Sequence, residues 1–313
     1  MTNQIVFILS DARSGSTLID QLLGANDDVV TVGEVHWLAA YVRQDRSIYN
    51  PAHPLVCSCG NLVPECEFWR NVADAVERPL DTLRLRPRFF DAKKSGHADR
   101  KLVDRAKGRL KSLIQEHPAC YRNTVCQKIY DGPRVATDCI QLYDAIVKVT
   151  GARCIVDSSK TAFRFWSVYR QIPQRARVIL LARDYRAVVH SKMNRGKTLE
   201  SATRGWKQKI LQMEELTKGI ERGAVLRLKY ELLCEDPRKQ IERLCEFLDL
   251  KFSDEMLVRP AEGIHHLGGS PSKFDASKSA IKLDKSYLGV FSQIELQRME
   301  KIVGESARIW GYH

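Results

Sequence analysis

The sequence contains no run of apolar residues that could cross a membrane. A membrane-spanning helix needs roughly 20 mostly apolar residues, and the longest apolar runs, such as residues 178–182, are far shorter. The first residues, MTNQIVFILS, show no basic segment followed by an apolar stretch of signal-peptide length. We therefore expect a cytoplasmic protein without a transmembrane segment or a secretory signal.

The composition also lacks the features of a disulfide-stabilised scaffold. The nine cysteines are an odd number, so they cannot all pair within one chain, and a reducing compartment fits them better. Internal repeats and low-complexity tracts are absent as well. With 313 residues, of which 44% are apolar, the chain has enough material for a full core, which excludes collagen-like, coiled-coil and wholly disordered classes.

Short β-rich runs alternate with helical patterns along the chain. Strands are predicted at residues 5–9, 154–156, 178–181 and 224–228, and helices at 16–23, 186–193, 200–220 and 237–248. The strands are almost continuously apolar, which is typical of a parallel sheet that helices cover on both faces. The pattern predicts an α/β fold with a mostly parallel sheet, in a single domain over residues 1–313.

A long stretch without strand pattern, at about residues 45–135, interrupts this alternation and is predicted to be a helical insertion. Of the net charge of +12, the segment 84–111 contributes +8, from 11 basic and 3 acidic side chains. We favour a solvated helical face for this segment, with an acidic partner, an acidic acceptor or a membrane surface as the open alternatives.

The turn after the first predicted strand reads Ser10–Thr17, and a helix follows from Ser16. A strand, a tight turn with Gly15 and a helix N-terminus together form a cradle for an anion. The usual P-loop lysine is absent, because Ser16 stands in its place, and Ser10 replaces the first glycine. That lysine serves the β- and γ-phosphates of ATP. The loop suits a single 5′-phosphate that carries a further anionic group, with Arg13 supplying the charge; a loop that only caps the helix is the alternative.

A second strand–helix unit carries another candidate phosphate-binding site. Arg183 stands at the end of the strand predicted at residues 178–181, and Ser191 follows eight residues later on the next helix. The carboxyl ends of parallel strands are where α/β sheets bind ligands, and an arginine fork with a hydroxyl suits a separate phosphate. The alternative is that Arg183 pairs with a carboxylate and that Ser191 is a surface residue.

Together these motifs resemble the sulfotransferases that use 3′-phosphoadenosine 5′-phosphosulfate (PAPS), which have a P-loop-like α/β fold. The segment RSGSTL at residues 13–18 resembles their 5′-phosphosulfate motif, and the Arg183 to Ser191 spacing resembles their 3′-phosphate motif. Residues 229–237 and 267–273 are similar to two later family segments. The resemblance implies that the donor is bound by Arg13, Ser14, Gly15, Ser16, Thr17, Leu18, Arg183, Ser191, Tyr230 and Lys273.

One spacing is similar to that of the tyrosylprotein-type branch of the family. Gly33-Glu34 places the glutamate 21 residues after Arg13, and the resemblance implies that Glu34 is the catalytic base. His36 is the rival base, because a histidine accepts a proton near neutral pH without a shifted pKa. Arg13 and Lys160 are expected to stabilise the sulfonate and the leaving group, although Lys160 stands two positions from where the family usually has its lysine.

Three cysteines lie close together at Cys57, Cys59 and Cys66, with His53 upstream. Three cysteines and one histidine suit zinc, but the C-x-C pair differs from the C-x₂-C of common zinc knuckles. We expect no metal here, and buried thiols or a redox-labile disulfide instead. The two histidines His265 and His266 have no third residue at metal-ligand spacing. They are assigned to the acceptor pocket or to a loop.

The sequence therefore predicts an enzyme that moves a sulfuryl group from PAPS to an acceptor hydroxyl, without a metal cofactor and without nucleic acid as a partner. Tyrosine, sugar, lipid and small-metabolite hydroxyls all stay open as acceptors, as does the oligomeric state. A nucleotide kinase or NTPase with a degenerate P-loop is one alternative. A non-enzymatic basic binding protein is the other.

Overall fold

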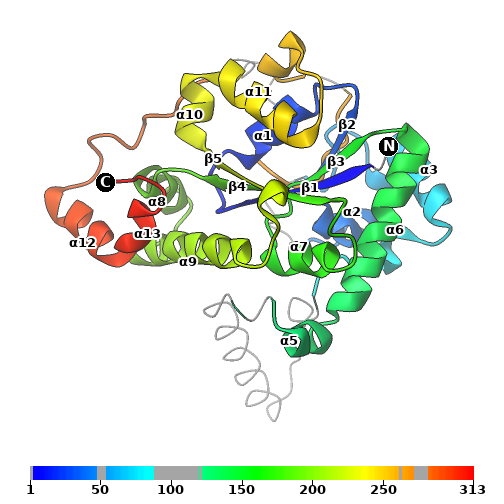
Figure 1. The fold of residues 1–313 in the computed structure, drawn as a ribbon, viewed down its shortest axis with the longest axis horizontal. Helices are drawn as coiled ribbons and strands as arrows, with labels where there is room; N and C mark the ends of the chain where they lie inside the picture. The colour runs from blue at the N-terminus through cyan, green and yellow to red at the C-terminus, as the bar shows by residue number, and fades with distance from the viewer. Residues whose placement is uncertain (1–2, 48–53, 88–118, 120–121, 261–262, 271–280) are drawn as a thin grey trace.

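The computed structural model describes residues 3–47, 54–87, 119, 122–260, 263–270 and 281–313. Within these residues, one parallel sheet of five strands has the order β2-β3-β1-β4-β5 (Figure 1). The strands are β1 Gln4–Ser10, β2 Val29–Gly33, β3 Cys154–Asp157, β4 Ala176–Ala182 and β5 Val225–Lys229. The expected α/β fold with a parallel sheet is confirmed.

The four predicted strands are all present, and the prediction missed only β2 among the described strands. Its sequence, VVTVG, consists largely of β-branched residues that favour strands, so the local signal was present although the run was not predicted as a strand. It pairs with β3, with Val29 opposite Cys154 and Gly33 opposite Asp157. This strand matters for the site because it brings Gly33, and the residue after it, to the end of the sheet where β3 also ends.

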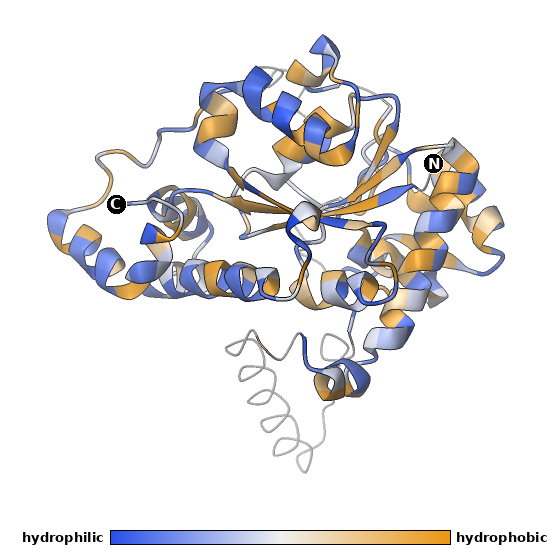
Figure 2. Cartoon of the chain, in the orientation of Figure 1, coloured by the Kyte–Doolittle hydropathy of each residue, from blue (hydrophilic) through white to orange (hydrophobic). Residues whose placement is uncertain are grey.

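Alternating residues of β1 face two different layers of the core. Ile5, Phe7 and Leu9 pack in one apolar cluster, while Val6 and Ile8 pack in another. The apolar run is continuous because helices cover both faces of the sheet. Figure 2 shows this distribution, with the apolar strands in the middle of the molecule and polar residues on the outer sides of many helices.

The helices lie on two sides of the sheet (Figure 1). One side carries α1 Ser16–Leu23, α10 Tyr230–Glu235 and α11 Pro237–Leu248, and the other carries α2 Leu38–Arg43, α6 Gly132–Thr150, α7 Ala162–Tyr169, α8 Tyr185–Met193 and α9 Leu199–Thr217. The remaining described helices are α3 Glu67–Val76, α5 Thr124–Ile129, α12 Gln293–Val303 and α13 Glu305–Arg308, with 3₁₀ turns at Val35–Trp37, Val63–Glu65, Leu80–Thr82, Arg222–Ala224 and Asp254–Leu257. The four predicted helices correspond to α1, α8, α9 and α11.

The stretch predicted as an insertion lies between β2 and β3. In its described part it holds α3 and α5, and α6 begins at Gly132. Most of the basic segment, residues 88–111, falls outside the described residues. Among the helices that the structure describes, none has the length and apolar character to span a bilayer.

Candidate active site

All five strands end at the same edge of the sheet, since they run parallel. A polar or charged side chain follows each strand directly: Asp11 after β1, Glu34 after β2, Ser158 after β3, Arg183 after β4 and Tyr230 after β5. This edge is the usual ligand site of an open parallel sheet. It gathers the candidate residues that the sequence places more than 200 positions apart.

The loop after β1 has the backbone form of an anion cradle. Arg13 and Gly15 both adopt the left-handed conformation, with φ of 75° and 93°, and α1 begins directly afterwards at Ser16. Gly15 is required for a second reason: a Cβ there would lie 2.4 Å from Cδ2 of Tyr230. The loop can therefore follow the face of this ring closely, and the first N–H groups of α1, which have no intrahelical acceptor, are free to meet an anion.

Arg13 reaches across to the two other predicted donor-binding segments. Its Nε donates a hydrogen bond to Oγ of Ser191 at 3.0 Å, and its Nη1 donates to Oγ of Ser270 at 3.4 Å. Burial, together with the nearby cations Arg195 and Arg183, lowers the pKa of the Arg13 guanidinium. A gathering of cations around Arg13 marks a place where an anion would be stabilised.

Arg183 follows β4, which lies on the side of β1 away from β2. It contacts the loop after β1, residues 11–15, which we call the phosphate loop. Its Nη1 donates to the Arg13 carbonyl at 3.1 Å, and its guanidinium lies 4.5 Å from the centre of the Tyr230 ring. Its Nη2 pairs with Asp284 at 2.9 Å. Burial opposes the charge on Asp284, yet hydrogen bonds from Ser286 and Arg183 lower its pKa to about 2. The carboxylate partner that the sequence left as an alternative is therefore present.

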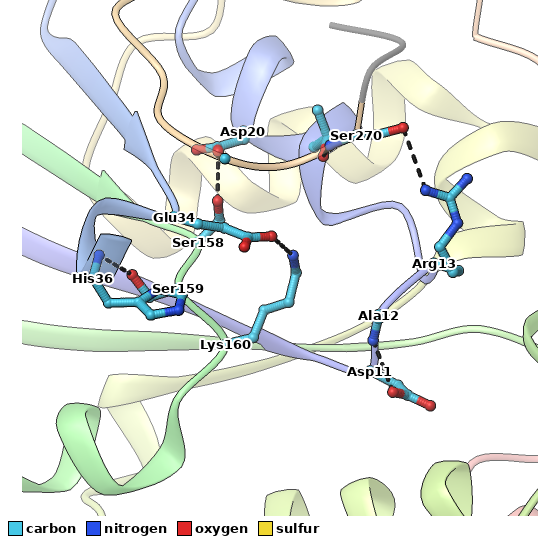
Figure 3. A network of polar contacts seen from close by, with 12 residues as sticks. Asp11, Ala12, Arg13, Asp20, Glu34, His36, Ser158, Ser159, Lys160 and Ser270 are labelled. Atoms are coloured by element: carbon cyan, nitrogen blue, oxygen red, sulfur yellow. Dashed lines mark hydrogen bonds and ion pairs between the residues drawn. The ribbon is translucent and has the colours of Figure 1, made fainter. Parts of the chain in front are cut away.

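Glu34 and Lys160 form an ion pair across the ends of β2 and β3 (Figure 3). Both side chains are mostly buried, with exposed fractions of 18% and 17%. Gly33 turns the chain into Glu34 with φ of 67°, and Lys160 is itself left-handed at φ of 59°. The unusual backbone at Lys160 directs its side chain back to Glu34, so the two-position displacement in sequence does not separate this lysine from the site.

His36, the rival base, makes different contacts. Its backbone N–H donates to Oγ of Ser159 at 3.3 Å, and its ring lies beside that of Trp37, 4.8 Å between centres. Burial is the main cause that holds the pKa of His36 well below its usual value, and Arg164 adds to it. The imidazole is therefore neutral, and within the described residues it is Glu34, not His36, that meets Lys160.

A buried network fixes the segment that carries Lys160. Arg164 is fully buried and pairs with Asp157 at 2.6 Å, while its Nη1 also donates to Oγ of Ser159 at 2.7 Å. On the other side, Oγ of Ser158 donates to Asp20 at 2.6 Å, and burial raises the pKa of Asp20 to about 8. Asp157, Ser158 and Ser159, the three residues before Lys160, are thus each held by a side chain from α1 or α7.

Residues 263–270 form a loop that contacts the Glu34 segment and the start of α1. The N–H of Leu267 donates to the Val32 carbonyl at 3.1 Å, and the N–H of Glu34 donates to the Leu267 carbonyl at 2.6 Å. Further along, the N–H of Ser270 donates to Oγ1 of Thr17 at 3.2 Å. The described part of the segment 267–273, which resembles a later family segment, therefore lies next to Glu34 and to the loop after β1, while Lys273 falls outside the described residues.

Two lysines at the site, Lys192 and Lys209, were not predicted from the sequence. Lys192 pairs with Asp11 at 2.5 Å, and its place directly after Ser191 was an available signal. Lys209, on α9, donates to the Lys160 carbonyl at 3.1 Å, and desolvation lowers its pKa to about 8. Nothing in the helical pattern of α9 indicates that Lys209 reaches the site.

The structure places His265 beside the three cysteines, which its spacing in the sequence did not predict. Its spacing left it without a third ligand partner, but the structure brings it to the three cysteines: the donor atoms of Cys57, Cys59, Cys66 and His265 all lie within 4.8 Å of one another. The other candidate ligand, His53, falls outside the described residues.

A model of the sulfotransferase family matches residues 5–254. The chain belongs to the sulfotransferase family. The match covers the phosphate loop, the Glu34–Lys160 pair and the Arg183–Ser191 unit. Two curated relatives are described as putative protein-tyrosine sulfotransferases, from Caenorhabditis briggsae (29% identical, 45% of this chain and 54% of the relative) and from Caenorhabditis elegans (28%, with 42% and 56%). The matched part thus spans about half the length of these relatives.

Solved structures of sulfotransferases share the fold. The sulfotransferase domain from the curacin biosynthetic pathway is 17% identical, with a TM-score of 0.56 over 100% of this chain and 99% of that one. The domain from the olefin synthase of Synechococcus PCC 7002 is 16% identical, with a TM-score of 0.52 over 100% and 97%. The predicted P-loop-like sulfotransferase fold is confirmed.

Proposed function

We propose that this member of the sulfotransferase family transfers the sulfuryl group of PAPS to an acceptor hydroxyl. The observation that carries the proposal is the Glu34–Lys160 ion pair, which lies beside a phosphate loop that has no P-loop lysine. A carboxylate and an ammonium group in contact suit a reaction in which a hydroxyl loses a proton while a phosphate oxygen gains charge. Family membership supports the same chemistry.

The donor would lie along the loop after β1. The N–H groups at the start of α1, with Ser14, Gly15, Ser16, Thr17, Leu18 and the Arg13 guanidinium, would hold the 5′-phosphosulfate. Arg183 and Ser191 would bind the 3′-phosphate, and Tyr230, which lies between Gly15 and Arg183, would line the floor of the nucleotide site. The 3′-phosphate then competes with Asp284 for Arg183.

In the transfer itself, the acceptor oxygen attacks sulfur and the bond from sulfur to the 5′-phosphate oxygen breaks. The acceptor proton passes to the Glu34 carboxylate. The Lys160 ammonium stabilises the charge that develops on the leaving phosphate oxygen, and Arg13 stabilises the sulfonate. As in phosphoryl transfer, positioning and electrostatics supply most of the rate enhancement.

For the acceptor, a tyrosine hydroxyl is the first candidate. The Gly33-Glu34 spacing supports it, as does the description of the two curated relatives as putative protein-tyrosine sulfotransferases. We test the proposal by incubating the full chain with donor labelled in the sulfuryl group and a panel of tyrosine peptides, sugars, lipids and small hydroxyl compounds. Labelled product from one class, and inhibition by adenosine 3′,5′-bisphosphate, are the expected results. Consumption of ATP–Mg²⁺ with no transfer from PAPS would favour the kinase alternative instead.

A further inference from the structure

Cys57, Cys59, Cys66 and His265 bring four donor atoms to one point outside the donor site. Sγ of Cys66 lies 3.6 Å from Sγ of Cys59, 3.9 Å from Sγ of Cys57 and 3.3 Å from Nδ1 of His265. Sγ of Cys57 lies 3.6 Å from the same Nδ1. The mechanism of sulfuryl transfer uses none of these groups.

These four distances are close to the edges of a tetrahedron of zinc ligands, and the two other pairs of donor atoms lie within 4.8 Å. With Zn–S bonds of about 2.3 Å and Zn–N bonds of about 2.0–2.1 Å, a tetrahedral site has S···S edges of about 3.8 Å and S···N edges of about 3.6 Å. A disulfide, by contrast, needs an S–S bond of about 2.05 Å, and it leaves the third cysteine and the histidine unexplained. We propose that this cluster is a structural Cys₃His zinc site.

The backbone around the cysteines is shaped for such a site. Gly60, at φ of 91°, closes a turn in which its N–H donates to the Cys57 carbonyl at 2.9 Å, and the N–H of Cys57 donates to the Asn61 carbonyl at 2.9 Å. Cys66 is the N-cap residue of α3, so the first turn of this helix fixes its position. Cys57 and Cys66 are fully buried while Cys59 is exposed, so a metal ion has an entry path.

His265 is held in place from outside the cluster. Its ring stacks on Phe68, with 4.6 Å between ring centres and an interplanar angle of 2°. The next residue, His266, receives the Ser58 N–H on its carbonyl at 3.1 Å, and its own N–H donates to Oγ of Ser58 at 2.8 Å. Hydrogen bonds that orient the ligand segments in this way are a regular feature of metal sites.

The site joins two segments that are about 200 residues apart in sequence. One is the turn at residues 57–66; the other is the loop at residues 263–270, whose Leu267 pairs with Glu34 and whose Ser270 reaches Thr17. Because four protein ligands leave zinc no open position, its role is to hold this loop over the site and not to activate a substrate. This inference departs from the metal-free chain that the C-x-C spacing predicts.

Metal analysis of the purified full chain tests the proposal without any activity assay. We expect about one zinc ion per chain. Cobalt in its place should give the thiolate charge-transfer and tetrahedral d–d absorption of a Cys₃His site. Cys59→Ser and His265→Ala should each lose zinc and weaken the cobalt bands, whereas the matched controls Cys126→Ser and His313→Ala should keep both.

Zinc removal by a chelator should lower the Tm by about 5 °C or more, and added zinc should restore it. The proposal is wrong if the wild-type chain, purified and then offered zinc or cobalt, holds no stoichiometric metal, or if non-reducing mass spectrometry shows a disulfide between Cys59 and Cys66. Both results concern metal and thiols alone, so either one leaves the proposed sulfuryl transfer standing.

Discussion

Lys160 donates a hydrogen bond to the Glu34 carboxylate across the ends of the adjacent strands β3 and β2. The pair depends on backbone features at both ends. Gly33 has no room for a side chain, since a Cβ would lie 2.4 Å from the Leu267 carbonyl oxygen, and Lys160 adopts a left-handed backbone that non-glycine residues rarely use. Strain of this kind persists where the surrounding structure fixes it, and it is concentrated at functional sites.

Glu34→Gln should lower kcat by roughly 10²–10⁴-fold, the usual contribution of a general base. Glutamine keeps the size of the side chain and one hydrogen-bonding oxygen, but it cannot accept the acceptor proton. The affinity for adenosine 3′,5′-bisphosphate should change little, because its phosphates are proposed to bind the loop after β1 and the pair Arg183 and Ser191. Steady-state kinetics with saturating donor, alongside calorimetry with the bisphosphate, measure the two effects.

His36→Ala is the control for this assignment. It should keep turnover within about a factor of 10, which corresponds to a barrier change of roughly 1.4 kcal/mol, because the described contacts of His36 are with Ser159 and Trp37. Normal turnover in Glu34→Gln together with its loss in folded His36→Ala would show that the histidine is the base.

Gly268→Ala should reduce kcat more than it reduces donor affinity. A Cβ at Gly268 would lie 2.8 Å from Cβ of Glu34, and the residue has φ of 65°, so the methyl group must displace either the loop or the Glu34 side chain. The matched control is Gly223→Ala, where nothing lies within 4 Å of the added carbon. Equal kinetics in the two variants would mean that this loop does not position Glu34.

Arg183→Ala should weaken the binding of adenosine 3′,5′-bisphosphate by about 1.5–3 kcal/mol, the range for a charge-assisted hydrogen bond, and leave the binding of 5′-AMP almost unchanged. Asp284→Asn should strengthen bisphosphate binding, because it removes the carboxylate that competes for Arg183. Calorimetric titration of both ligands into both variants gives the comparison. Equal losses of affinity for the two ligands would show that Arg183 does not bind the 3′-phosphate.

Donor affinity should fall as the pH rises above about 8. Desolvation lowers the pKa of Lys209 to about 8 in the free protein, and a bound anion favours the charged ammonium, so the pKa is higher in the complex. The contribution of Lys209 is therefore complete below pH 8 and is lost as the pH rises through the higher pKa of the complex.

At pH 8, bisphosphate binding should take up protons, which appears as a dependence of the calorimetric enthalpy on the ionisation enthalpy of the buffer. Lys209→Met should abolish this uptake. Lys207→Met, which changes the opposite side of the same helix, should keep it. Proton uptake that is unchanged in Lys209→Met would assign the effect to another group.

The sequence predicted the parts of the fold whose signals are local. The apolar runs gave four of the described strands, and the RSGSTL turn, with Gly15 at its centre, marked the phosphate loop and the start of α1. Arg183 was placed correctly at the end of β4, because the end of a buried strand is visible in the sequence. Contacts between these segments follow from parallel topology, which brings all strand ends to one edge.

Contacts that depend on distant side chains were not predictable in this way. Asp284 follows β4 by about 100 residues and becomes the partner of Arg183 through a segment without periodic pattern. His265 joins the cysteines because the loop after α11 returns to β2, and no spacing rule links positions so far apart. Lys209 shows no local signal either, since a lysine on a long helix is normally solvated.

The most direct test of the account is a calorimetric comparison of adenosine 3′,5′-bisphosphate with ATP–Mg²⁺ on the wild-type chain, because it needs no knowledge of the acceptor. Two separate phosphate-binding sites and the missing P-loop lysine predict that the bisphosphate binds without added divalent metal. It should bind at least about 10-fold more tightly than ATP–Mg²⁺, a difference of roughly 1.4 kcal/mol in binding free energy. Tight binding of ATP–Mg²⁺ with no detectable binding of the bisphosphate would contradict the account.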